Sequence, residues 1–159
     1  MMKFSSILRV DKAEYKKWAD GNRIKVNGNV AQWYISGGSD YSYQTFCKYL
    51  DIVFMYAGTA SLSKELVSVP YTSLQPGDVF IKGGSPGHAV IVVDVAIYPQ
   101  TGKKVFLLAQ SYMPAQQIHI LVNPANRGLS PWYELSDNDE GKLYTPEWVF
   151  EKKDLKRFK

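Results

Sequence analysis

The alternation of apolar and polar residues divides the chain into a first part of helices with one hairpin and a later part rich in strands. In the first part, two apolar runs over residues 23–26 and 30–35 flank the dipeptide Asn27-Gly28. This dipeptide is the strongest short-range signal for a β-hairpin. A short helix that Gly21 ends precedes the hairpin.

A long helix is predicted from Asp40 to Gly58. Apolar side chains recur there at spacings of three and four residues, as they do on one face of a helix. They are Tyr43, Phe46, Leu50, Val53, Phe54 and Ala57. A shorter helix is predicted over residues 61–67, and Pro70 ends it.

The later part of the chain is predicted to form an antiparallel meander. Apolar runs joined by short turns rich in glycine and proline span residues 78–82, 88–98, 104–112 and 117–122. We expect the tail that follows to wrap over the sheet, with a helical turn at Thr145–Trp148. The fold class is therefore α+β, an antiparallel meander sheet with the Asp40 helix packed on it.

Length, composition and charge limit the class of protein. The chain has 159 residues, 45% of them hydrophobic, which suits a single domain over residues 1–159. Its net charge is +4, but basic residues concentrate only in the tail 152–159, so we expect no nucleic-acid partner. The sequence shows no signal peptide and no apolar run of membrane-spanning length. One cysteine and two histidines are too few for a zinc site, and we expect no metal or cofactor.

His88 is the first candidate for chemistry. The glycine-rich loop over residues 83–87 places it at the start of a buried strand, and Gly87 lets the backbone approach a ligand closely. A histidine held by a rigid scaffold can act as a base or bind a ligand. The alternative is a structural histidine that hydrogen-bonds the backbone of the loop.

Gln110 and Ser111 lie on the strand after His88. Neighbouring residues of a strand face opposite sides, so only one of the two side chains faces His88. The length of the turn at residues 99–102 sets the register, and the pattern leaves the choice open. Gln110 could also satisfy backbone groups of the loop. His119 is expected at the surface or at an edge of the sheet.

Cys47 is the single thiol of the sequence. A cysteine nucleophile gains from the first turn of a helix, where free N–H groups lower its pKa. Counted from Asp40, Cys47 lies about two turns into the helix. Its place on an apolar stripe with Tyr43, Leu50 and Phe54 favours a small buried hydrophobic residue instead.

Two resemblances accompany these patterns. The order Gly-Asp, apolar strand, Gly-His, apolar strand over residues 77–94 resembles the central hairpin of papain-like cysteine hydrolases of bacterial cell walls, the NlpC type. Nearly the whole chain resembles the C-terminal portion of an uncharacterised bacterial family known as a domain of unknown function. The segments that carry this second resemblance are residues 18–24, 56–62, 88–94, 108–116 and 130–133.

The resemblances imply a papain-like fold and an exported, envelope-associated protein. In papain-like enzymes a polar residue on the strand after the histidine orients its ring, the part that Gln110 or Ser111 would take here. When Asp40-Tyr41-Ser42 is aligned with the Asp-Cys-Ser that opens the NlpC nucleophile helix, Tyr41 stands in the place of the cysteine. A phenol is a poor substitute for a thiolate at neutral pH. Ser42 is either a hydroxyl nucleophile or a helix cap.

The function expected from these observations is binding of a peptide, amide or glycan fragment of the cell envelope beside His88, Gln110 and Tyr41. One alternative is a cysteine amidase or peptidase with His88 as base and a thiol from Cys47 or from outside this chain. Another is a non-catalytic protein-interaction module. Members of the family are longer and carry a cysteine on an upstream helix. If that helix is missing here, an exposed apolar strip and a homodimer are expected.

Overall fold

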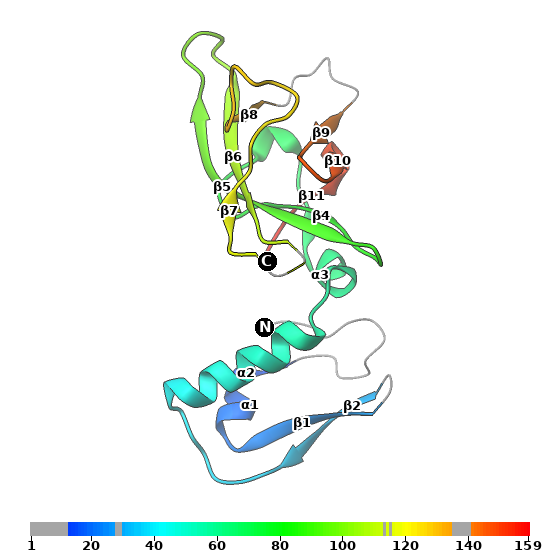
Figure 1. Ribbon diagram of the computed structural model, residues 1–159. Helices are drawn as coiled ribbons and strands as arrows, with labels where there is room; N and C mark the ends of the chain where they lie inside the picture. Colours follow the sequence, from blue (N-terminus) through cyan, green and yellow to red (C-terminus); the bar gives the residue numbers. More distant parts are fainter. Residues whose placement is uncertain (1–12, 28–29, 113, 115, 135–140) are drawn as a thin grey trace. The chain divides into compact units, whose positions relative to one another are not determined.

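The computed structural model describes residues 13–27, 30–112, 114, 116–134 and 141–159 (Figure 1). The chain divides into two compact units, Met1–Glu65 and Leu66–Lys159, and each is described by itself. No helix among the described residues is long and apolar enough to cross a lipid bilayer.

The first unit pairs helices with one hairpin. Antiparallel β1 and β2 have Asn27 opposite Val30, which confirms the predicted hairpin, while its turn at residues 28–29 lies outside the described residues. The core of this unit includes Trp18 of α1, Ile24 of β1 and Tyr49 of α2. The elements are α1 (Tyr15–Ala19), β1 (Asn22–Asn27), β2 (Val30–Ile35), α2 (Tyr43–Tyr56) and α3 (Thr59–Glu65).

The buried face of α2 agrees in part with the predicted apolar stripe, because Val53 lies in the core of this unit and Phe46, Leu50 and Ala57 pack against it. Thr45, Tyr49 and Val53 are the buried residues of the helix, whereas Tyr43 is 81% and Phe54 69% exposed. Tyr49 turns inward because its hydroxyl can donate to the carbonyl of Ala13, at 2.9 Å, while its ring packs in the core. Aromatic residues lie on both sides of α2, so apolar spacing alone identified the buried side only in part.

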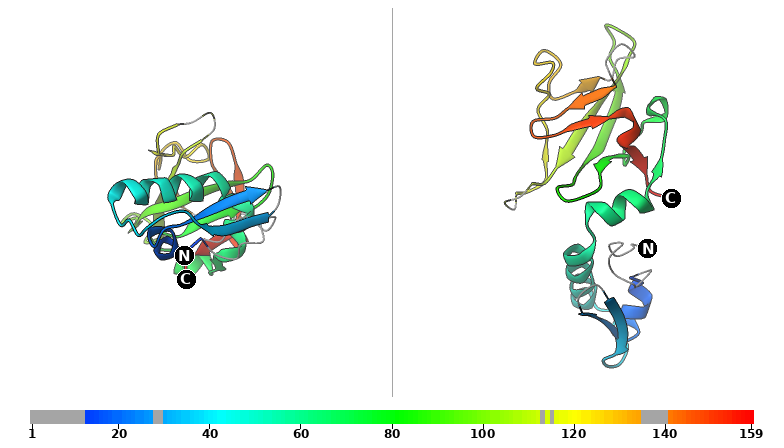
Figure 2. Two further views of the ribbon diagram at one scale, coloured as in Figure 1. Left: turned by 90° about the horizontal axis from the view of Figure 1, so that it is seen from below. Right: turned by 90° about the vertical axis from the view of Figure 1, so that its right-hand side faces the viewer.

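The second unit is an antiparallel sheet of seven strands in the order β3-β11-β4-β5-β6-β7, with β8 also paired to β6. The predicted meander is confirmed for β4 through β7. The strands of this sheet are β3 (Val67–Ser68), β4 (Val79–Lys82), β5 (His88–Ile97), β6 (Lys104–Gln110), β7 (His119–Ile120), β8 (Tyr133–Glu134) and β11 (Leu155–Arg157). The right-hand view of Figure 2 shows strands of this sheet side by side, in colours from green to red.

The tail differs from the prediction in two ways. The segment Thr145–Trp148 is the turn of a hairpin between β9 (Lys142–Tyr144) and β10 (Val149–Glu151), not a helical turn. The chain end does not only wrap over the sheet, because β11 enters it between β3 and β4. Short 3-10 helices at Tyr71–Ser73 and Lys152–Asp154 complete the unit.

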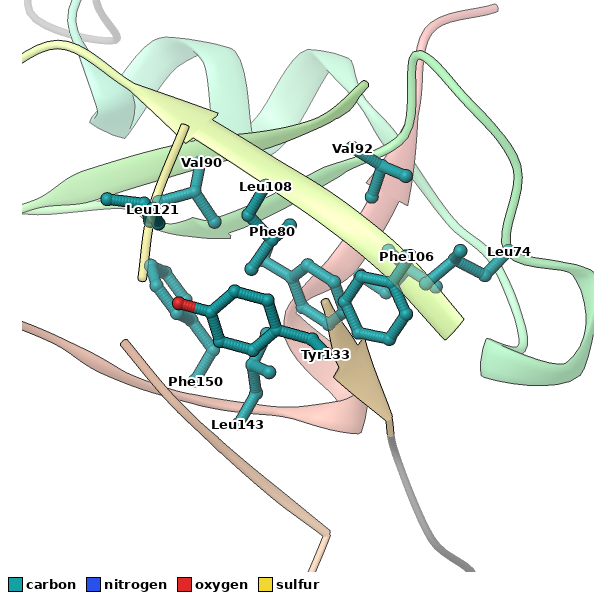
Figure 3. Close-up of a cluster of buried hydrophobic side chains, with 11 residues drawn as sticks. Leu74, Phe80, Val90, Val92, Phe106, Leu108, Leu121, Tyr133, Leu143 and Phe150 are labelled. Atoms are coloured by element: carbon teal, nitrogen blue, oxygen red, sulfur yellow. The ribbon is translucent and has the colours of Figure 1, made fainter. Parts of the chain in front are cut away.

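Aromatic rings fill the core between the sheet and the β9–β10 hairpin (Figure 3). Phe106 stacks on Phe80 and on Tyr133, with ring centroids 6.0 Å apart in both pairs. The hydroxyl of Tyr133 donates to the carbonyl of Val122, at 2.5 Å, and burial raises its pKa. Phe150 brings β10 into the same core, so the hairpin is held against the sheet by apolar packing.

An ion pair between a buried carboxylate and a half-buried guanidinium joins β11 to the residue before β4. Asp78, immediately before β4, is 0% exposed. Arg157 of β11 donates from Nε to Oδ1, at 2.6 Å, and from Nη2 to Oδ2, at 2.9 Å. The carboxylate raises the pKa of Arg157, and the backbone N–H of Gln75 donates to Oδ2 as well. The charge of Asp78 is thus compensated on both oxygens.

Replacement of Asp78 by alanine is expected to destabilise the second unit by about 3 kcal/mol, because it removes a buried carboxylate that accepts hydrogen bonds on both oxygens and leaves the Arg157 guanidinium without its partner. Urea unfolding monitored by hydrogen exchange of the β4 and β5 amides measures this effect. The matched control is Lys153→Ala, which removes an exposed ion pair with Glu151 and should leave the unfolding midpoint almost unchanged. Equal effects of the two substitutions would contradict the role given to Asp78.

Candidate functional site

The register of β5 and β6 brings His88 and Gln110 together. Ile91 pairs with Ala109, and the same antiparallel register, continued toward the start of β5, places Val90 opposite Gln110. His88 and Gln110 therefore share one face of the sheet. Their side chains meet with His88 Nε2 2.6 Å from Gln110 Oε1. Gln110, not Ser111, is the residue that faces the histidine.

A second hydrogen bond determines the orientation of the Gln110 amide. Its Nε2 donates to Oε2 of Glu147, at 2.9 Å. A carboxylate only accepts hydrogen bonds, so the amide nitrogen must face Glu147 and the amide oxygen must face His88. The oxygen in turn accepts a hydrogen bond from the Nε2–H group of His88. In the neutral ring, Nδ1 is then the nitrogen without a proton and can accept one.

Aromatic rings enclose the imidazole of His88. Trp148 stacks on it with ring centroids 5.3 Å apart and planes inclined by 16°. Tyr112 meets it edge-on, at 5.1 Å and 68°. His88 and Gln110 are only 9% and 3% exposed, so the ring has little freedom to turn. The ring plane and the tautomer are both fixed before any ligand arrives.

A cavity of about 420 Å³ opens beside His88. Gly87 and Ser111, both predicted to contact a ligand, are part of its wall. The complete lining is Pro86, Gly87, His88, Ser111, Tyr112, Gln116 and Trp148. The cavity thus combines a fixed histidine, two aromatic side chains and the polar groups of Ser111 and Gln116.

Glu147 is a site residue that the sequence did not indicate, and its neighbour Trp148 lies against the same histidine. Both lie in the β9–β10 turn, where Thr145 N–H donates to the carbonyl of Trp148, at 2.8 Å, and Trp148 N–H donates back to Thr145 Oγ1, at 3.2 Å. Pro146 occupies the second position of this four-residue turn, where proline is favoured. That signal, between two short apolar runs, could have indicated a hairpin.

Tyr41, Ser42 and Cys47 belong to the first unit, and their predicted roles beside His88 stay predictions. Ser42 is the N-cap of α2, with Oγ accepting from Thr45 N–H at 3.2 Å. Tyr41 donates a short hydrogen bond to the Asp20 carboxylate, which raises the pKa of the phenol. The helix begins at Tyr43, so Cys47 is its fifth residue and not two turns in; it is half-buried rather than buried.

Two further predictions concern His119 and metal ligands. His119 is exposed on β7, at the end of the strand order, as expected. Its Nδ1 lies 3.0 Å from the carbonyl oxygen of Gln117. The described residues contain no group of three or more histidine, cysteine, aspartate or glutamate side chains that could hold a metal ion.

The tautomer of His88 is directly testable. In the wild-type chain at mildly alkaline pH, long-range ¹H–¹⁵N correlation spectra should show His88 protonated on Nε2 alone. Gln110→Leu removes the accepting oxygen at similar volume, so a mixture of tautomers is expected. Ser111→Ala, one residue away on the other face, should retain the single tautomer. A wild-type ring protonated on Nδ1 would refute the amide orientation.

The cap of α2 should weaken in acid. Hydrogen bonds from the Thr45 hydroxyl and the Ser42 N–H lower the pKa of Asp40. A carboxyl whose pKa is lowered by folding stabilises the fold above its unfolded pKa, and this contribution is lost as the pH falls through the folded value. The protection factor of the Thr45 amide, which compares its exchange rate with the intrinsic rate at the same pH, should therefore fall below the ordinary aspartate pKa. Asp40→Asn should abolish that pH dependence, and Asp51→Asn, an exposed carboxylate of the same helix, should preserve it.

Comparison with known proteins assigns the chain to a family. No curated protein and no solved structure matches the chain. A family model described as "Domain of unknown function (4846)" matches residues 3–157, which include every residue of the site. The chain therefore belongs to this family of unknown function, as the resemblance predicted.

Proposed function

We propose that this protein binds a peptide, amide or glycan fragment of the bacterial cell envelope in the cavity beside His88. The observation that carries the proposal is the chain of hydrogen bonds from Glu147 through Gln110 to His88 at the wall of that cavity. Such a chain fixes the orientation of the buried ring. Preorganised polar groups at a concave surface are typical of binding and catalytic sites.

The cavity suits a small fragment of this chemistry. Its volume of about 420 Å³ lies within the range of small-molecule sites. The ring faces of Trp148 and Tyr112 can stack on sugar rings or peptide planes. Ser111 and Gln116 can exchange hydrogen bonds with amide or hydroxyl groups of a ligand. An envelope origin for the ligand comes from the resemblance to NlpC-type enzymes.

The same resemblance leads us to propose a papain-like fold. An antiparallel sheet, a histidine at the start of β5 and an orienting side chain at the end of β6 support it. In this proposal Gln110 takes the part of the polar residue that orients the histidine. The likeness lies in this local order of parts.

Hydrolysis is the second candidate, and the unprotonated Nδ1 of His88 favours it. A cysteine amidase or peptidase needs a base that takes the thiol proton and later returns it to the leaving amine. His88 in this tautomer meets the requirement for the base. The thiol would come from Cys47 or from outside this chain.

Binding can be tested with three probes that separate the candidate ligands: a disaccharide muropeptide, its stem peptide alone, and its disaccharide alone. NMR titration should shift the signals of His88 and the Trp148 indole with at least one probe. Trp148→Leu should weaken binding about tenfold because a stacking face is lost. Trp132→Leu is the matched control, since Trp132 lines a different cavity, at the other end of the β5–β6 hairpin.

The outcomes separate the candidates. No shift with any probe would overturn the proposed ligand class and favour a protein-interaction module. Cleavage of a probe, detected by mass spectrometry and lost in both His88→Ala and Cys47→Ala, would establish the hydrolase with Cys47 as nucleophile. Binding that survives Trp148→Leu as well as Trp132→Leu would place the ligand elsewhere on the chain.

A further inference from the structure

The free edge of β7 is the strongest unexplained feature of the second unit. β7 is the last strand in the order of the sheet. Leu121 N–H donates to the carbonyl of Leu108, at 2.8 Å, so the backbone of Leu121 faces β6. Backbone direction alternates along an antiparallel strand, which turns the N–H and C=O groups of Ile118 and Ile120 away from β6. Among the described residues, no hydrogen bond to these groups is found.

The side chains at this edge are apolar and exposed. Ile118, Ile120 and Val122 are 69%, 46% and 61% exposed and lie on one face of the sheet. Edge strands are normally protected by short length, charged residues, proline or a bulge, and β7 has only the first of these, with two residues. Residues 117–122 contain no charged residue and no proline. An aliphatic edge that lacks charge and proline is a template for pairing with another strand.

The edge continues directly into the cavity beside His88. His119 pairs with Gln110, so its side chain lies on the same face of the sheet as Gln110 and His88. Gln116, two residues before Ile118, lines the cavity. A strand added along β7 would therefore present alternate side chains to the aliphatic row and to the His88 face.

We propose that the ligand is an extended peptide that adds to the sheet along β7, with its end in the cavity beside His88. The inference rests on the proposed function and chooses the peptide among its three ligand classes. A peptide has backbone donors and acceptors at the spacing of a strand, which a glycan lacks. Aliphatic side chains at every second position would pack on Ile118 and Ile120. The continuity of edge and cavity favours a peptide over a second copy of this chain.

The probe is a positional-scanning library of acetylated hexapeptides in which every second residue is valine. NMR of the full chain with the best peptide should show cross-strand contacts from peptide amides to Ile118 and Ile120, and a shift at His88. Ile120→Pro removes one outward N–H without touching the bonds to β6, and should weaken binding about tenfold. Ile120→Val keeps the N–H and an aliphatic side chain, and should bind like the wild type.

A second measurement covers the case in which Ile120→Pro fails to fold. Methylation of the peptide nitrogens that face β7 removes the same class of hydrogen bond from the ligand, and should weaken binding to the wild-type chain by a similar factor. Peptide or muropeptide binding that shifts His88 but not Ile118 or Ile120 would overturn the inference and leave the proposed function standing. Failure of all probes at His88 would overturn both. Concentration-dependent contacts between β7 strands of two copies would show a dimer edge and also overturn the inference.

Discussion

The buried carboxylate of Asp78 is the constraint on which the second unit depends. A charge with no solvent exposure must be compensated, and its partner Arg157 comes from the other end of this unit, 79 residues away along the chain. The pair therefore favours only those arrangements in which the C-terminal strand lies beside β4. Apolar packing would tolerate several positions of a three-residue strand, whereas a bidentate pair with fixed geometry tolerates few. The position of β11 between β3 and β4 follows from this requirement.

The geometry of the candidate site depends on the position of β11. The β9–β10 hairpin immediately precedes β11, and Phe150 holds it against the aromatic core. Its turn then carries Glu147 to the Gln110 amide and Trp148 to the face of His88. Each contact restricts the position of the next group. The Asp78–Arg157 pair positions β11, β11 positions the preceding β9–β10 turn, and this turn orients the Gln110 amide and the His88 ring. A buried histidine with one tautomer is the result of long-range packing rather than of its own loop.

Local signals in the sequence predicted much of the fold and part of the site. The Asn-Gly hairpin, the meander and the position of His88 depend on turn residues and on alternation, which neighbouring residues determine. The pairing of Gln110 with His88 could not be predicted in this way, because the β5–β6 register shifts between Val92 and Asp94 and such an irregularity has no clear sequence mark. The role of Glu147 could not be predicted from the sequence for a different reason. Its contact with Gln110 spans 37 residues and depends on where β11 docks. The buried face of α2 was predicted in part: Val53 lies in the core, whereas the inward position of Tyr49 depends on its hydrogen bond and not on apolar spacing.

Strand β6 connects the two features for which we propose a binding role. Gln110, the last residue of β6, takes part in both features. Its side chain hydrogen-bonds the ring of His88, and its backbone pairs with His119 of the exposed edge. Because side chains alternate across a sheet while backbone groups lie in its plane, one strand can fix an imidazole ring above the sheet and support a pairing edge beside it. The two roles use different parts of Gln110. Its side-chain amide must stay oriented by Glu147, and its main chain must stay paired with His119. Any ligand that used both features would therefore meet a site whose parts are already aligned, which lowers the entropy lost on binding.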